Sequence, residues 1–421
     1  MSGNTRSENT SSGRARARSL ALIGGALLVA GLGAVGIAVQ AQAQNTAPEK
    51  LTEEELLSRI TAAPENAPDF SATVTVEQTL VPEGLLGASQ GDGAGASGPR
   101  SARIWHSQDQ FRTELQGENG DQVFVRNGNE VSAYDGATNT LRTGQKPVDA
   151  EEQRPEQAAS PEEINEALAE ISPTSNLEVG SPREFAGRWV HPLTLTPRDK
   201  DLTLVEQTEA LVDAETFVPL SFQLYAEGSP EQPVISYKAS DFQVGEVPDE
   251  RFQLETPPGA AVEPMEEWGE EESGERREPQ QVASVEEAQQ IVGYPVGQIS
   301  APGGRELTEI RVLGSDGVIQ TYGEGWGTVT LVQKPEGAKE QQEGESPDGG
   351  SQEEGSDRKG DGRGGELQIP TIDLGGVEAQ EISTPIGTGL SWNANGVSYS
   401  LVGSVPAAEL EEVARGLLGQ A

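Results

Sequence analysis

Residues able to carry out acid–base, nucleophilic or metal chemistry are few in this sequence, apart from carboxylates. The chain has no Cys and only two His, His106 and His191, each within a strand-like run. A single His in a strand more often packs than transfers protons or binds a metal. Among 69 acidic residues, two carboxylates close in sequence do not single out a catalytic pair. We therefore expect a protein that is not an enzyme, with no catalytic residue, metal or cofactor; a hydrolase using buried carboxylates is the less favoured alternative.

Two loops resemble ligand-binding motifs but depart from them at the positions that bind. Residues 357–368, DRKGDGRGGELQ, match the first, fifth and sixth positions of a calcium loop, yet Lys359 holds the third position and Gln368 replaces the bidentate Glu. Residues 323–327, GEGWG, do not follow the dinucleotide fingerprint, and no phosphate-binding Gly-Lys-Ser/Thr occurs. We expect neither site, and we interpret residues 323–327 as a loop between strands.

The charge of the chain excludes one class of partner. A formal net charge of −40 repels nucleic acid and anionic membrane surfaces, so we expect no nucleic-acid binding. The carboxylates are expected to form a solvated surface. Without Cys the chain has no disulfide, no thiolate metal site and no lipid-modified Cys as an anchor.

The N-terminus has the pattern of a membrane anchor. Residues 1–19 form a basic tail, and residues 20–39, LALIGGALLVAGLGAVGIAV, carry no charge. At roughly 1.5 Å per residue this segment reaches about 30 Å, the thickness of a hydrocarbon core, and the arginines before it stay cytoplasmic. We expect a single-pass protein of the cell membrane with its bulk outside the cytoplasm. The alternative is a signal sequence cleaved after Ala43, because residues 41–43 have the A-x-A form.

Residues 49–262 read as one domain built mainly of strands. A helix is expected over 48–62, followed by a strand at 70–80, a mobile loop at 87–98 and a meander over 101–135 that turns at Asn127-Gly128. A second helix is expected over 161–171. Further strands are expected at 184–195, 202–211, 217–226, 234–242 and 251–254.

A smaller α+β domain follows an acidic linker, residues 263–281, which has too few apolar residues to bury a core. This domain comprises residues 282–334 and 367–421, interrupted by a disordered insertion at 335–366. Ser284 is expected to cap a helix, Asn395-Gly396 to form a hairpin turn, and residues 406–418 to form a terminal helix.

The strands of the first domain carry more apolar and aromatic side chains than one solvated face needs. These side chains either fill an ordinary core or line a concave face that stays open as a hydrophobic pocket, and period-two alternation does not decide between the two. The candidate ligand-binding residues are Ile104, Phe111, Val123, Val125, Trp189, Phe222, Leu224 and Tyr237.

Over residues 51–262 the order of segments resembles the outer-membrane lipoprotein carrier (LolA-like) superfamily. The matching motifs are an aromatic-Arg pair at Phe111-Arg112, a hairpin at 127–135, the run VDAETFVPL at 212–220 and a closing segment at 252–259. The resemblance implies an α+β chain whose curved, open-barrel antiparallel sheet wraps around helices and holds acyl chains in an apolar cavity. Regulators of sigma-factor signalling are relatives that share this fold. The anchor and the second domain depart from the soluble carrier, which makes shuttling between membranes doubtful here.

The C-terminal part resembles an uncharacterised domain of membrane-anchored bacterial envelope proteins, on the residues Trp392, Gly396, Tyr399, Leu401 and Gly403. The two resemblances imply a membrane-anchored extracytoplasmic protein that binds a lipid, lipoprotein or lipopeptide, in envelope lipoprotein handling or stress sensing. The alternative is a protein–protein interaction module without a lipid cavity, which binds an envelope regulatory protein of a sigma/anti-sigma system.

Overall fold

The computed structural model describes residues 47–66, 68–80, 100–107, 110–117, 120–145, 172–265, 279–315, 317–336 and 369–419. The expected membrane segment, the loop at 87–98, the helix at 161–171 and the calcium-like loop lie outside these ranges, as do most of the acidic linker and most of the insertion. Within the ranges, no helix combines the length and the apolar character needed to cross a membrane.

The first part of the chain forms one large open sheet, which is 13-stranded within the described residues. Its edge strands β13 and β7 do not pair with each other, so the sheet does not close into a barrel. Strand β13 runs parallel to β6, and the other neighbours are antiparallel. In sheet order the strands are β13 (Ala261–Pro264), β6 (Thr140–Gln145), β5 (Glu130–Asp135), β4 (Gln122–Asn127), β3 (Gln110–Leu115), β2 (Arg100–Ser107), β1 (Phe70–Gln78), β12 (Pro233–Val244), β11 (Pro219–Ala226), β10 (Val205–Asp213), β9 (Arg188–Pro197) and β7 (Ser175–Val179), with β8 (Arg183–Phe185) paired to β9.

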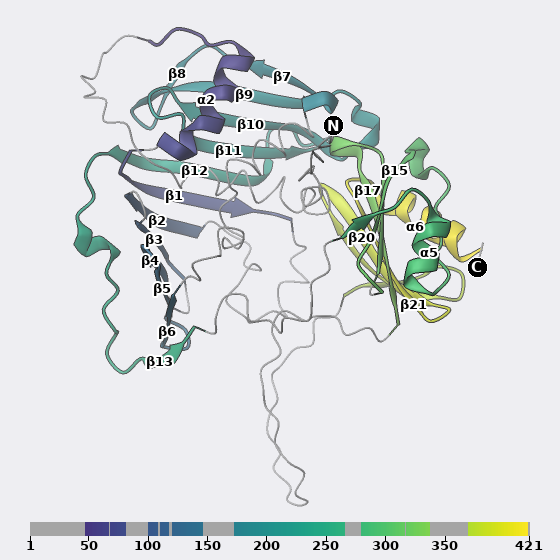
Figure 1. Cartoon of the computed structure of the whole chain (residues 1–421). Helices are drawn as coiled ribbons and strands as arrows, with labels where there is room; N and C mark the ends of the chain where they lie inside the picture. Colours follow the sequence, from purple (N-terminus) through teal and green to yellow (C-terminus); the bar gives the residue numbers. More distant parts are fainter. Residues whose placement is uncertain are drawn as a thin grey trace, which may run out of the picture.

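The large sheet bends, so that β7–β12 form one wall and β2–β6 another (Figure 1). Strand β1 joins the walls, because it pairs with β2 on one side and with β12 on the other. Its register with β12 shifts between Thr73 and Val74, an irregularity of the kind that increases local twist. The expected open antiparallel sheet is thus present.

A second sheet, which has eight strands among the described residues, follows in the chain and lies beyond one end of strands β9–β11 (Figure 1). Its alternating strands bury one face under two helices, α5 and α6. In sheet order the strands are β14 (Gln280–Gln281), β15 (Leu307–Val312), β16 (Val318–Tyr322), β17 (Val329–Pro335), β21 (Val397–Gly403), β20 (Gly387–Ala394), β19 (Glu378–Thr384) and β18 (Thr371–Asp373).

The described residues contain three α-helices, α2 (Glu53–Asn66), α5 (Val285–Val292) and α6 (Ala407–Leu418). Helix α2 begins with a capping box, in which Thr52 Oγ1 accepts a hydrogen bond from Glu55 N at 3.2 Å and Glu55 Oε2 accepts one from Thr52 N at 2.9 Å. Ser284 caps α5 as expected, because its Oγ accepts from Glu287 N at 3.2 Å. Short 3₁₀ turns are η3 (Ser172–Thr174), η4 (Lys200–Leu202), η5 (Asp249–Phe252), η6 (Pro302–Gly304) and η7 (Gly325–Gly327).

Besides shifts of element ends, the structure differs from the sequence-based expectation at two turns and one strand. The hairpin between β4 and β5 turns at Gly128 and Asn129, because Asn127 still pairs with Glu130 and only Gly128 takes a positive φ. The expected strand at 184–195 is broken by a turn at residues 186–187, so that β8 folds back on β9. The expected strand at 251–254 is wrong: residues 249–252 form η5.

Candidate functional site

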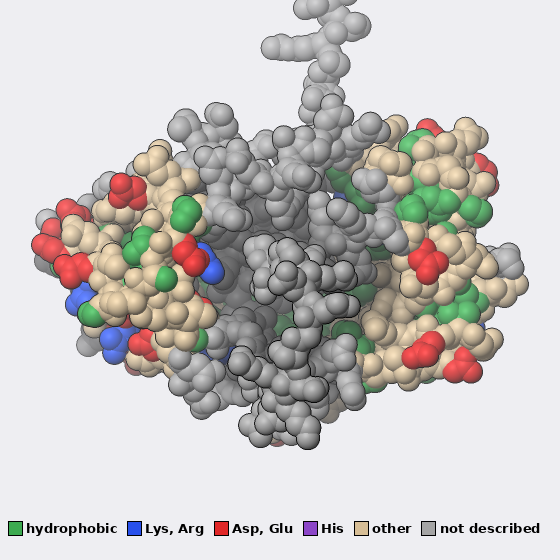
Figure 2. Space-filling view, turned by 90° about the horizontal axis from the view of Figure 1, so that it is seen from below, with side chains coloured by type: hydrophobic (Ala, Val, Ile, Leu, Met, Phe, Trp, Pro, Cys, Tyr) green, Lys and Arg blue, Asp and Glu red, His purple; other side chains and the backbone are tan. Residues whose placement is uncertain are grey.

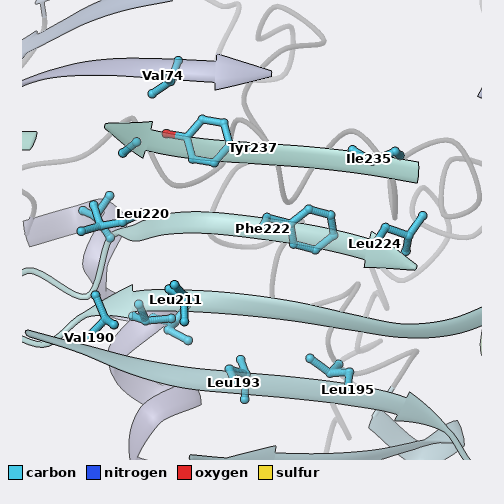
Figure 3. Close-up of a cluster of buried hydrophobic side chains, with 14 of the residues drawn as sticks. Val74, Val190, Leu193, Leu195, Leu211, Leu220, Phe222, Leu224, Ile235 and Tyr237 are labelled. Carbon is cyan, nitrogen blue, oxygen red and sulfur yellow. The ribbon is translucent and has the colours of Figure 1, made fainter. Parts of the chain in front are cut away.

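Cross-strand pairing gathers large apolar side chains on one face of the large sheet, across β7–β12 and the adjoining β1 and β2, which we call the inner face (Figure 3). Phe222 lies opposite Tyr237, and Leu224 lies opposite Ile235. Tyr237 in turn lies opposite Val76 of β1. Further members of this face, assigned by the same register, are Ala72, Val74, Ala102, Ile104, Leu193 and Leu195.

One hydroxyl of this apolar cluster is buried without a hydrogen-bond partner among the described residues. The Tyr237 side chain is 4% exposed, and its Oη has no hydrogen-bond partner among the described residues. Burial raises the pKa of Tyr237, so the phenol stays neutral and able to donate a hydrogen bond. A buried hydroxyl without a partner costs free energy, and such groups are rare in native proteins. The hydroxyl points along the sheet toward Leu220 rather than toward Ile235 (Figure 3).

Helix α2 covers one end of the inner face. Its Leu56 and Ile60 belong to the same buried cluster as Phe222. The guanidinium of Arg59 lies 5.1 Å above the Phe217 ring, and that ring stacks on His191 with centroids 6.4 Å apart. His191 lies on the same face of β9 as Leu193 and near the first residue of that strand. The contact of Arg59 with Phe217, which stacks on His191, therefore places α2 at the end of the inner face where β9 begins.

A buried carboxylate shapes the turn that presents Phe217. Asp213 accepts hydrogen bonds from Arg188 Nε at 2.5 Å and from the backbone N of Thr216 at 2.9 Å. Phe217 consequently adopts a φ of 59°, a strained value for an aromatic residue. The motif VDAETFVPL therefore fixes the turn on which α2 rests.

The opposite face of the β2–β4 strands is covered by a different segment, residues 245–254, which we call the strap. Arg112 Nη1 donates to the carbonyl oxygens of Arg251 and Gln253, each at 3.1 Å. Phe252 of the strap is buried against Val125 of β4. These contacts explain why the segment around η5 forms no strand: the carbonyl groups of Arg251 and Gln253 accept from a guanidinium instead of from a neighbouring strand.

The candidate ligand-binding residues consequently divide between the two faces. Phe222, Leu224, Tyr237 and Ile104 belong to the inner cluster, and Phe111 packs against it. The other three lie elsewhere: Val125 and Val123 join the strap cluster on the opposite face, and Trp189 lies opposite Glu184 of β8, in neither cluster.

Both histidines are buried among aromatic rings. His106 stacks on Phe70 with centroids 5.2 Å apart. Burial lowers the pKa of His106, against a hydrogen bond with the Pro68 backbone and the charge of Asp69. Burial likewise lowers the pKa of His191, aided by the charge of Arg59. The described residues contain no group of three or more His, Cys, Asp or Glu arranged to hold a metal ion.

Sequence reasoning missed several residues of this site. Leu193 and Leu195 were detectable from the alternation of β9, and Ile235 from that of β12. Trp326, within the expected loop 323–327, is a buried member of the inner cluster although it belongs to the second sheet's part of the chain. Its flanking glycines were the available signal, because paired glycines permit a close approach to another backbone.

No family model matches the sequence, and no curated protein is significantly similar to it. Solved structures that resemble the fold include the MucA/MucB complex of Pseudomonas aeruginosa, at 16% identity and TM-score 0.40, covering 86% of this chain and 96% of that chain. A LolA superfamily protein from Nitrosomonas europaea matches at 11% identity and TM-score 0.20, covering 48% and 98%. Lipoprotein LppX of Mycobacterium tuberculosis matches at 11% identity and TM-score 0.23, covering 49% and 100%. One of these solved structures is named for the LolA superfamily, which the sequence motifs resemble.

Proposed function

We propose that the chain is a binding protein for a lipid, lipoprotein or lipopeptide, whose apolar chain lies against the inner face and whose polar group meets Tyr237 Oη. One observation carries the proposal: a contiguous apolar face contains a single buried hydroxyl that lacks a partner among the described residues. An ordinary core gains nothing from that hydroxyl, whereas an amphipathic ligand offers it a hydrogen bond. The proposal assigns no catalytic role to any residue.

Burial of the face predicts how the ligand enters. Phe222 and Leu224 are 2% and 1% exposed, so a ligand reaches them only by displacing the atoms that cover them. Association is then expected to be slower than diffusion and to accelerate on warming, because binding waits for a conformational change.

The proposal is tested by titrating the full chain with a fluorescent fatty acid. Replacing Phe222 by Asp places a charge on the apolar face and should abolish binding. Tyr237→Phe is the sharper variant: it should weaken binding roughly fivefold, for one net hydrogen bond of about 1 kcal/mol. The same variant should leave the free energy of unfolding unchanged or raised, because it removes a buried hydroxyl that has no described partner.

Tyr322→Phe is the matched control. Tyr322 Oη accepts from Ile299 N at 3.0 Å and donates to Gln320 Oε1 at 2.5 Å within the second sheet. Its loss should destabilise the fold while leaving the affinity for the fatty acid unchanged. Absence of binding by any fatty acid, with no lipid in extracts of the purified protein by mass spectrometry, would contradict the proposal.

We place the binding domain outside the cytoplasm, held by residues 20–39 as a membrane segment. The support is the uncharged 20-residue length of that segment and the arginines before it. Fractionation of cells should find the full chain in the membrane, and a chain lacking residues 20–39 should not be found there. Recovery of a soluble protein that begins at Gln44 would instead indicate cleavage after Ala43.

A protein partner is the second candidate function, favoured by apolar residues on the second sheet. Val402 and Ile382 are 46% and 38% exposed, and both lie opposite Gly389 on the face that α5 and α6 leave uncovered. Figure 2 shows apolar side chains grouped on the second sheet's side of the molecule. Val402→Lys should then reduce capture of a stoichiometric protein from native membranes without changing fatty-acid affinity.

A further inference from the structure

The two sheets meet through a set of buried hydrogen bonds, which we call the seam. Leu204 N donates to the carbonyl oxygen of Ser404 at 2.9 Å, and the hydroxyls of Thr203 and Ser404 lie 2.9 Å apart. Arg305, which is 4% exposed, donates from Nη2 to the carbonyl oxygen of Leu202 at 2.8 Å. Because these groups are buried and paired, the seam holds the second sheet at a fixed position on the first.

The seam also places one aromatic side chain of the second sheet's part of the chain inside the first. Trp326 is 3% exposed, and its Nε1 donates to Ser175 Oγ of β7 at 2.7 Å. The turn that carries it lies directly against η3, the turn that precedes β7: a Cβ on Gly325 would stand 1.9 Å from Thr174 Oγ1. Gly325 also has a φ of 56°, so glycine is required there on both counts. The indole is therefore held rigidly.

The register shows where the indole lies. Ser175 lies on the same face of β7 as Leu177, and Leu177 lies opposite Leu195 of β9. On the next strand, Thr208 lies between Leu195 and Leu224. Trp326, Leu195 and Leu224 share one buried cluster, and Leu177 packs against it. The indole thus stands at the end of the inner face where β9 finishes, whereas α2 covers the end where β9 begins.

The row of apolar side chains between Tyr237 and the Trp326 end of the inner face is short. At roughly 3.3 Å per residue, the stretch of β12 from Tyr237 to Pro233 is about 13 Å long. From Tyr237 toward Pro233, apolar side chains continue through Ile235 and Leu224, whereas the Tyr237 hydroxyl points toward Leu220 (Figure 3). A ligand whose polar group meets Tyr237 and whose apolar chain lies over Phe222 and Ile235 directs the end of that chain toward Trp326.

We infer that Trp326 limits the length of the apolar chain that the inner face accepts, and so determines specificity. This inference rests on the proposed function. Each methylene added to a ligand gains burial until the chain end meets the indole, which is pinned to Ser175 and does not move aside. Methylenes beyond that length find no further apolar surface.

The inference is tested on the full chain by displacing a fluorescent fatty acid with unbranched fatty acids of increasing length. The affinity for the wild type should rise with length and then level off. In Trp326→Ala the rise should continue past that limit, by about fourfold per methylene, the equivalent of about 0.8 kcal/mol for each buried methylene. Trp392→Ala removes an indole from the second sheet's own core and should leave the limit unchanged.

A second measurement serves if Trp326→Ala does not fold. Trp326→Phe retains an aromatic ring, and a fatty acid brominated at its methyl end should quench tryptophan fluorescence more in the wild type than in this variant. Bromine beside the carboxyl group should show no such difference. An unchanged length limit in folded Trp326→Ala, or equal quenching in both proteins, overturns the role of Trp326. Failure of every fatty acid to bind overturns the proposed function instead.

Discussion

Replacing Asp213 by Asn is expected to lower the free energy of unfolding by about 3 kcal/mol, because breaking a buried ion pair costs roughly 3–5 kcal/mol and the amide keeps part of the hydrogen bonding. The carboxylate is 1% exposed. Its Oδ1 accepts from Arg188 Nε, whereas Oδ2 accepts from Arg188 Nη2 at 2.9 Å, from Thr216 N at 2.9 Å and from Thr216 Oγ1 at 2.8 Å. The Asn side chain has one acceptor oxygen where Asp213 has two. Its NH₂ group must therefore take the place of one carboxylate oxygen and face N–H or O–H donors of Arg188 or Thr216.

For a domain of this size, about 3 kcal/mol corresponds to a fall in melting temperature of roughly 6–12 °C. Calorimetry of the wild type and of Asp213→Asn measures it. Asp241→Asn is the control, because Asp241 is exposed on β12 and is expected to change stability by less than about 0.5 kcal/mol. A melting temperature within about 2 °C of the wild type for Asp213→Asn would refute the role given to the buried carboxylate.

The loss should also be local. The Asp213 turn carries Phe217, which contacts both His191 and Arg59 of α2. Amide hydrogen exchange in α2 should therefore accelerate in Asp213→Asn, while exchange in α6 of the second sheet stays unchanged. Equal acceleration in both helices would mean that the turn has no special connection to α2.

Two further predictions concern His106 and Arg112. The folded-state pKa of His106 is lowered, so the unfolded chain takes up a proton first as the pH falls below about 6.5, and stability should decrease by up to about 1.4 kcal/mol per pH unit. His106→Phe keeps the stack on Phe70 and should remove that part of the slope in denaturant titrations between neutral and mildly acidic pH; an identical slope would contradict it. Arg112→Met leaves the strap carbonyls of Arg251 and Gln253 without their donor, which should cost about 1–2 kcal/mol and accelerate exchange in residues 249–254. Unchanged exchange there would show that the guanidinium does not hold the strap.

Local sequence rules predicted the turn at Asn395-Gly396 correctly and the turn at Asn127-Gly128 one residue out of place, and the difference has a physical reason. At Asn395-Gly396 both residues have positive φ, 54° and 78°, as a two-residue turn of that dipeptide requires, and the prediction is confirmed. At Asn127-Gly128 the same dipeptide is shifted by one position. Asn127 Oδ1 accepts from Gln110 Nε2 at 3.1 Å, so the residue stays in the sheet beside β3 and the turn passes to Asn129. A neighbouring strand overrides the local preference.

The candidate site was predictable strand by strand but not across the sheet. Period-two alternation separates the two faces of β4 without saying which one turns toward Phe222. Val123 and Val125 point toward the strap, a segment more than 100 residues later whose 3₁₀ turn no periodicity indicates. Trp326 is further still from β7 in sequence, and only the seam brings it to the inner cluster.

The motifs that carry the LolA-like resemblance hold irregular segments in place rather than line the inner face. Asp213 fixes a turn and Arg112 fixes the strap, and each satisfies several donors or acceptors that no other residue type at that position would satisfy together. Apolar positions such as Leu224 are less restrictive, because several side chains of similar volume bury comparable area. A sequence can therefore keep the frame of this fold while its apolar lining changes. Under the proposed function, ligand choice then rests on the two features outside those motifs, the Tyr237 hydroxyl and the Trp326 indole. Replacing either of these two residues should change which ligand is bound, whereas replacing Asp213 should first lower the stability of the fold.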